Sequence, residues 1–202
     1  MKKRIKFLFT IASLCFAVAV LCFGVYSATT VTYTASGTVS YEVDSVFCKI
    51  ETSVHYAKDL KKSLGSVEAV TTEAGKVAAA NWTATGTAIA AYDTKSDPNA
   101  AAPTAVTLDP FNFGTSSLYR ITVVVTLYKQ ANTIKLTHNL VSKDAPNALV
   151  NTTIATAANV DNIDASTGEK TQTLTFYVAL ADVTTAASGG FTLTVNVAQA
   201  GA

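Results

Sequence analysis

The sequence has little charge, one tryptophan and few cysteines. Only 14% of its 202 residues are charged, 15 Lys and Arg against 14 Asp and Glu, and it contains three cysteines. This balance of charges excludes a nucleic-acid binder that relies on an excess of basic residues. A hydrophobic fraction of 49% beside so few charges also excludes a disordered chain. The sequence therefore indicates a packed core, and its length fits one domain.

Motifs that would identify an enzyme or a metal site are also missing. There is no His-x-x-x-His or Cys-x-x-Cys spacing, no Gly-x-Ser-x-Gly motif, and no phosphate-binding or dinucleotide fingerprint. The two histidines are far apart in the sequence, and we expect His55 to be exposed and His138 to be half-buried. We therefore expect no catalytic residue and no cofactor, in a protein that is not an enzyme.

What the chain does have begins with an export signal. The first six residues hold four cations, an apolar run spans 7–25, and the small residues Ser27 and Ala28 follow. This order is typical of a secretory signal peptide, and we predict cleavage between Ser27 and Ala28. The alternative is a retained membrane anchor, although the run is short for a bilayer span. The predicted organisation is a signal peptide at 1–27, processed by signal peptidase, and a single domain at 28–202.

Removal of the signal peptide changes both the charge and the cysteine content. It carries four of the 15 cations and none of the acids, which leaves 11 against 14 and a net charge of −3. Two of the three cysteines are also lost, so the remaining Cys48 cannot form an internal disulfide. Stability must then come from a packed core. We expect Cys48 to be a small buried hydrophobic residue, with a reactive or intermolecular thiol as the alternative.

The rest of the chain reads as β-strands. In residues 29–43 the odd positions are the apolar set and most even positions are Thr or Ser, a period of two that places one set on a core face. Because this run is long for one strand, we expect a bend or bulge at Gly37 that splits it between two sheets. The apolar set moves to even positions after Asp44 and Ser45, which predicts a corner or bulge there.

About eight strands with turn residues between them, and little helix, predict an all-β fold. We expect a two-sheet antiparallel sandwich, with a jelly roll ahead of an immunoglobulin-like topology, after an N-terminal signal helix. Residues 118–128 are predicted to be a central strand that forms a hairpin with 133–141. Residues 58–64 are predicted to form a short helical turn.

Two loops carry oxygen-bearing side chains that suit calcium. The calcium candidates are Asp93, Asp97, Asn99, Asp161 and Asp164. Neither loop matches the EF-hand pattern, and Asp and Asn are also common turn residues, so ordinary turns are the alternative.

Short segments of the sequence resemble one family. Residues 34–39 read Thr-Ala-Ser-Gly-Thr-Val soon after the signal peptide, a strand with a lone Arg120 follows an Asn-Phe-Gly turn, and the last strand ends in Val-Ala-Gln. These features resemble the TasA/camelysin-like exported proteins of Gram-positive bacteria. The resemblance implies a jelly-roll protein of biofilm matrix fibres or surface appendages, in which an N-terminal strand of one subunit completes the sheet of its neighbour.

The residue pattern points to the same segment. Residues 28–36 form an alternating strand directly after the cleavage site, and such a strand can pair with its own sheet or with the sheet of another subunit. The assembly-strand residues are Thr29, Val31, Tyr33, Ala35 and Gly37. We therefore predict an extracellular structural protein that forms a homo-oligomer or filament by strand addition. We expect it to bind no nucleic acid and to contact a membrane only through an uncleaved signal segment.

The alternative is a monomeric secreted binding module or adhesin. It would recognise glycan or host protein through the loops at 93–103 and 157–170. The single tryptophan, Trp82, lies near Tyr92 in the sequence. This pair is either a platform on which a sugar stacks or ordinary core packing.

Overall fold

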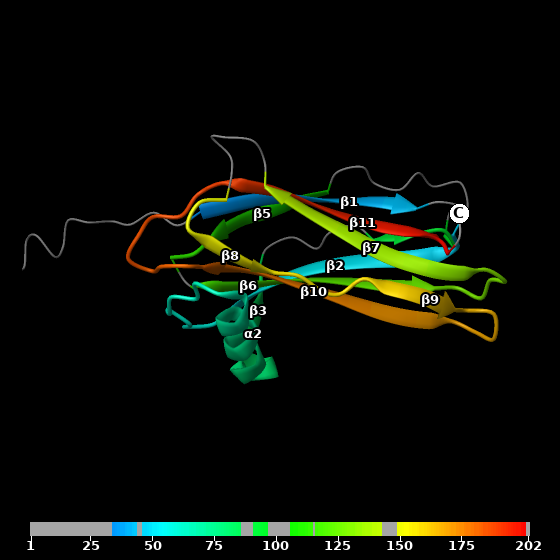
Figure 1. The fold of residues 1–202 in the computed structure, drawn as a ribbon, viewed down its shortest axis with the longest axis horizontal. Helices are drawn as coiled ribbons and strands as arrows, with labels where there is room; N and C mark the ends of the chain where they lie inside the picture. Colours follow the sequence, from blue (N-terminus) through cyan, green and yellow to red (C-terminus); the bar gives the residue numbers. More distant parts are fainter. Residues whose placement is uncertain are drawn as a thin grey trace, which may run out of the picture. The chain divides into compact units, whose positions relative to one another are not determined.

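The computed structural model describes residues 34–43, 46–85, 91–96, 106–114, 116–142 and 149–200. All of them belong to one unit, Thr32–Ala202. The predicted two-sheet β-sandwich is confirmed for these residues (Figure 1). The predicted signal helix and its cleavage site lie outside the described residues.

The two sheets have five and six strands. Sheet 1 contains, in spatial order, β5 (Val106–Asn112), β1 (Thr34–Val43), β11 (Gly190–Gln199), β7 (Thr133–Ser142) and β9 (Val160–Asp164). Sheet 2 contains β3 (Trp82–Ala84), β2 (Cys48–Ala57), β6 (Leu118–Leu127), β10 (Lys170–Leu180) and β8 (Thr152–Ala155), and β4 (Tyr92–Asp93) also pairs with β2. The described residues thus hold eleven strands, of which three have four residues or fewer.

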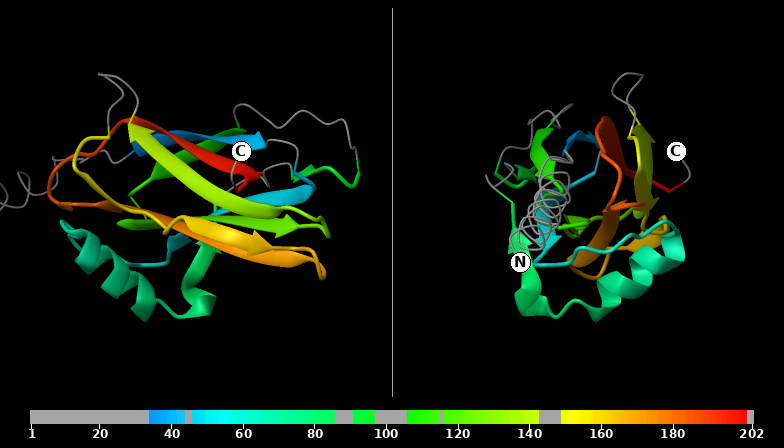
Figure 2. Two further views of the ribbon diagram at one scale, coloured as in Figure 1. Left: turned by 45° about the vertical axis from the view of Figure 1, so that its right-hand side comes forward. Right: turned by 90° about the vertical axis from the view of Figure 1, so that its left-hand side faces the viewer.

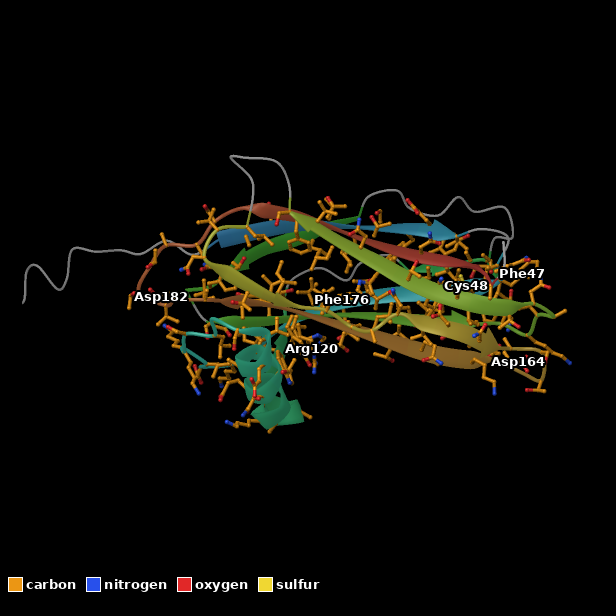
Figure 3. All side chains as sticks on the ribbon, in the orientation of Figure 1. Phe47, Cys48, Arg120, Asp164, Phe176 and Asp182 are labelled. Atoms are coloured by element: carbon orange, nitrogen blue, oxygen red, sulfur yellow. The ribbon has the colours of Figure 1, made fainter. Side chains whose placement is uncertain are left out.

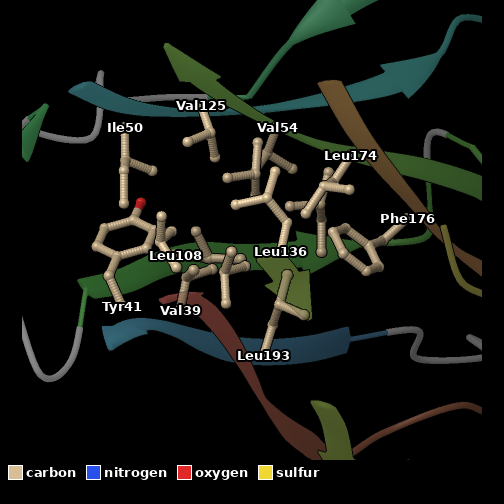
Figure 4. Close-up of a cluster of buried hydrophobic side chains, with 14 of the residues drawn as sticks. Val39, Tyr41, Ile50, Val54, Leu108, Val125, Leu136, Leu174, Phe176 and Leu193 are labelled. Carbon is tan, nitrogen blue, oxygen red and sulfur yellow. The ribbon is translucent and has the colours of Figure 1, made fainter. Parts of the chain in front are cut away.

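The core lies between the sheets and follows the predicted alternation. In β1 the buried positions are odd, and in β2 they are even, as in Cys48, Ile50 and Val54. Figure 4 shows how side chains from the two sheets meet there, with Tyr41 and Leu193 from one sheet and Phe176 from the other. The change of parity marks a corner, because the chain leaves sheet 1 after β1 and enters sheet 2 with β2. Asp44 and Ser45 themselves lie outside the described residues.

One prediction about strand pairing is wrong. The strands at 118–128 and 133–141 do not form a hairpin, because β6 lies in sheet 2 and β7 in sheet 1. Their connection crosses from one sheet to the other. The predicted antiparallel pairing is confirmed for the described strands, apart from β1, which runs parallel to β11. The prediction that 118–128 is a central strand is confirmed, because β6 lies between β2 and β10.

One α-helix is described, α2 (Val67–Lys76), and it covers part of the outer face of sheet 2 (Figures 1 and 2). Ser66 caps its first turn by accepting a hydrogen bond from the Ala69 amide. The predicted helical turn at 58–64 is wrong. The main chain there bonds to neighbouring segments instead, the Ser117 amide donating to Leu60 and the Leu64 amide to Leu180.

Candidate functional site

The predicted assembly strand is described from Thr34 onward, where it forms the start of β1. Thr29, Val31 and Tyr33 lie outside the described residues, as do Ser27 and Ala28 at the predicted cleavage site. Ala35 and Gly37 are buried and face the core. β1 pairs antiparallel with β5 on one side and parallel with β11 on the other. The described part of this segment is therefore an interior strand of its own sheet.

Gly37 fixes the register of β1 on β11. It lies directly opposite Phe191, and a Cβ atom added to Gly37 would come within 2.2 Å of the Phe191 Cζ atom. The Phe191 side chain is 0% exposed, so its ring cannot move aside into solvent. A slip of two residues, the smallest that keeps the same face inward, would place Ala35 or Val39 beneath the ring. The expected bulge in this run is wrong for the described residues, because β1 pairs with β11 without interruption from Ser36 to Val43. The register of β1 on β5 does shift between Ala35 and Gly37, but there the extra residue belongs to β5.

The expected split of this run between two sheets is wrong for the described residues. Residues on both sides of Gly37 pair with β5, and those from Ser36 to Val43 all pair with β11. The whole of β1 therefore belongs to sheet 1.

Hydroxyl groups line the outer face where β1 meets β11. The Oγ1 atoms of Thr38 and Thr192 are 3.2 Å apart, and Ser40 Oγ is 3.0 Å from Thr194 Oγ1. These side chains lie opposite one another in the parallel register. Neutral cross-strand pairs of this kind stabilise the sheet without the charged side chains that protect most exposed sheets from association.

The four sheet edges are short or irregular. At the β5 edge, Asp109 and Pro110 together oppose the single residue Ser36, and Pro110 has no amide to donate. At the β9 edge the register also shifts, and Asn162 has a φ of 58°. In sheet 2 the edges are the three-residue β3 and the four-residue β8. Such edges discourage the addition of a further strand.

The first predicted calcium loop uses its acidic residue internally. The Asp93 carboxylate accepts hydrogen bonds from the Tyr128 hydroxyl at 2.7 Å, the Lys95 amide at 2.8 Å and the Ser96 hydroxyl at 3.0 Å. These bonds, led by that from Tyr128, lower the pKa of Asp93. Asp97 and Asn99 lie outside the described residues.

The second predicted calcium loop also forms a turn. Asp164 accepts a hydrogen bond from the Ser166 amide at 2.8 Å, and Asp161 forms an ion pair with Lys135 at 3.6 Å. Among the described residues no three His, Cys, Asp or Glu side chains come together in a way that would hold a metal ion.

The prediction for Cys48 is confirmed, since its side chain is 0% exposed. Burial, together with the nearby Asp93 carboxylate, raises the pKa of the thiol to about 12. A thiol held protonated in this way is a poor nucleophile.

The two histidines differ from each other. His138 is half-buried as predicted, with Nε2 2.6 Å from the Ala157 carbonyl oxygen and its ring edge-to-face with Phe176. His55 is partly buried rather than fully exposed. Burial first, and the nearby Arg120 second, lower the pKa of His55.

One group of side chains on the outer face of sheet 2 was missed by the sequence prediction. It consists of His55, Trp82, Arg120 and Tyr177, and is called the Arg120 cluster below. Arg120 lies directly opposite both His55 on β2 and Tyr177 on β10. The Arg120 Cζ atom is 4.2 Å from the centroid of the Trp82 ring. The centroids of the Trp82 and Tyr177 rings are 6.3 Å apart. Figure 3 shows Arg120 on the side of sheet 2 that carries α2.

The predicted pair of Trp82 and Tyr92 does not form, because the two side chains belong to different clusters. Tyr92 is buried and belongs to the core between the sheets, whereas Trp82 is partly exposed on the outer face. The signal available in the sequence was the lone arginine at 120, placed at an outward position of a strongly apolar strand.

Comparisons with known proteins give no family for this chain. No protein-family model matches it, and no curated protein matches it significantly. Among the described residues, no helix is both long enough and apolar enough to span a membrane.

Proposed function

We propose that this chain is an exported structural protein, the subunit of an extracellular bacterial fibre, biofilm matrix or surface appendage. The subunits join by β-strand addition: β1 of one subunit occupies the place between β5 and β11 of the next. The observation that best supports this is the position of β1, an interior strand close to the N-terminus, in a sandwich whose edges are short or irregular.

Replacement of β1 fits the sheet better than addition at an edge. A strand added beside β5 would meet Pro110 and the bulge opposite Ser36, and one added beside β9 would meet another register shift. The place between β5 and β11 offers regular pairing over eight consecutive residues of β11. Because the contacts of β1 are with β5 and β11, the same strand from a second copy would make the same contacts.

The connection of β1 to the rest of the chain suits such an exchange. β1 is followed within a few residues by β2, which lies in the other sheet. A change of direction at this corner would carry β1 away from its own sheet without disturbing β2. Each subunit then gives one strand and receives one, which is a head-to-tail arrangement that propagates as an open filament.

A disulfide that holds β1 in its own sheet tests this proposal. Thr38 and Thr192 lie opposite each other with their hydroxyls in contact, so T38C/T192C places two thiols on neighbouring strands. We expect the oxidised monomer to form no filaments in electron micrographs, and reduction to restore them. The control pair T38S/T192S should assemble under both conditions. Filaments grown from fully oxidised monomer would refute the exchange of β1.

A further inference from the structure

We propose that the Arg120 cluster is a binding site for an acidic sugar, with the Arg120 guanidinium holding the sugar carboxylate. The site lies on the outer face of sheet 2, away from β1, and the argument does not depend on whether the chain polymerises. It rests on a cation that has no acidic partner among the described residues, on two aromatic rings beside it, and on the hydroxyl groups in the next row of the sheet.

Arg120 is a cation without an anionic partner in the described part of the chain. It is the only arginine after residue 4. Its side chain forms no ion pair or hydrogen bond with any described residue, and its Nε atom is buried without a partner. The nearest acid on the same face of β2, Glu51, is paired with Lys49 at 2.8 Å. The terminal guanidinium nitrogens likewise form no hydrogen bond with a described residue, and a guanidinium can donate two parallel hydrogen bonds to one carboxylate.

The surroundings of Arg120 favour a sugar over a simple carboxylate. The Trp82 and Tyr177 rings are partly exposed, and their planes differ by 35°. Both rings pack against the apolar side chains between α2 and sheet 2, and the guanidinium lies over the Trp82 ring. In the proposed complex, the C–H groups of a pyranose ring pack against the parts of the two rings that stay exposed. A guanidinium binds a carboxylate with two parallel hydrogen bonds. A hexuronic acid carries its carboxylate directly on such a ring and so uses both features.

The next row of the sheet provides hydroxyl groups for a neighbouring sugar unit. Ser53, Thr122 and Thr175 lie opposite one another on β2, β6 and β10, two residues along from the row of His55, Arg120 and Tyr177. Their side chains are exposed or partly exposed on the same outer face. The two rows together form a strip that suits an acidic oligosaccharide rather than a single anion.

Trp82 makes the test direct, because it is the only tryptophan in the chain and its fluorescence reports on this site alone. The intact protein is titrated with trigalacturonic acid and, in parallel, with its methyl ester, which has the same sugar rings without the charge. We expect saturable binding of the acid and at least a tenfold weaker affinity for the ester, since a hydrogen bond to a charged group contributes that much.

Variants separate the site from general electrostatic attraction. R120Q and R120K should each weaken binding about tenfold or more, because R120K keeps the charge but loses the planar pair of donors. The control K76Q removes a cation from the side of sheet 2 that carries α2, leaves Glu73 paired with Lys62, and should leave the affinity unchanged. Thermal melting checks that every variant is folded. If R120Q does not fold, the comparison is made with R120K alone.

Three results would overturn the proposal. The first is the absence of saturable binding of trigalacturonic acid to the wild type at millimolar concentration. The second is equal weakening by K76Q and R120K, which would indicate adsorption to a charged surface. The third is equal binding of the acid and a short peptide with one carboxylate, because the aromatic rings would then contribute nothing.

Discussion

The ring of Phe191 occupies the space that a side chain at Gly37 would need. Gly37 lies near the start of the domain's sequence and Phe191 near its end. The two residues are neighbours in the only parallel pair of the described strands. One contact between a glycine and a phenylalanine thus sets the register of the first strand on the last. In the proposed filament, the same contact would set the register of one subunit on the next.

Replacement of Gly37 should destabilise the fold. In G37A the new methyl group would lie within 2.2 Å of the Phe191 ring. We expect the free energy of unfolding to fall by about 1–3 kcal/mol, the usual cost of overpacking a core. Urea denaturation measures it. F191L should recover part of the loss in the double variant.

Gly75 provides the matched control for this substitution. It lies in the last turn of α2, and a Cβ atom there would meet nothing within 4 Å. G75A should therefore raise stability by about 0.5–1 kcal/mol, because alanine is the better helix former. Equal losses in G37A and G75A would show that the ring of Phe191 is not the cause.

The hydrogen bond between Tyr41 and Thr52 joins the two sheets inside the core. Both residues are buried, and they share a hydroxyl–hydroxyl bond. Y41F leaves the Thr52 hydroxyl without this partner and should cost about 1–2 kcal/mol of unfolding free energy. In a T52V background the same change should cost about 1 kcal/mol less. A double-mutant cycle measures this coupling, and additive losses would contradict it.

Cys48 should resist thiol reagents in the folded protein. Its thiol is buried, and its pKa is raised to about 12. We expect negligible labelling by a maleimide at neutral pH until the chain is unfolded in guanidinium, after which labelling should be complete. Mass spectrometry of peptides assigns the label to Cys48. Rapid labelling of Cys48 in the native protein would show that it is accessible and reactive.

His55 should make the stability depend on pH. Its folded-state pKa is lowered by burial and by Arg120, so the unfolded chain binds a proton more readily. Its contribution is fully present above the unfolded pKa of about 6.5 and is lost as the pH falls through the folded pKa. Between neutral pH and about pH 5, the melting temperature of the wild type should fall more than that of H55Q. Identical slopes would show that His55 does not titrate in this way.

The sequence predicts which face of each strand is buried better than it predicts which strands pair. In β1 and β2 the alternation and its change of parity are local properties, so the buried sides and the corner between them could be predicted. The hairpin prediction for β6 and β7 failed because alternation does not specify a partner. The connection carries Gln130, whose side chain bonds to the main chain of nearby Tyr128 and also to that of Phe47, which is 83 positions away in the sequence. The contact with Phe47 could not be predicted from a local pattern.

The candidate sites divide in the same way. Cys48 and His138 could be assigned from their positions in single strands. The Arg120 cluster could not, because it depends on β3, β2, β6 and β10 lying next to one another in that order. Proximity in the sequence predicts a pair of Trp82 and Tyr92, whereas the order of the strands places Trp82 beside Arg120 and Tyr177.

The exchange of β1 is tested most directly by oxidising T38C/T192C after assembly. The chain is allowed to form filaments under reducing conditions, is then oxidised, and is dissolved in denaturant for electrophoresis without reductant. If β1 of each subunit lies in the sheet of its neighbour, the two cysteines belong to different chains, and a ladder of covalent multimers should appear. A disulfide confined to single chains within well-formed filaments would contradict the account.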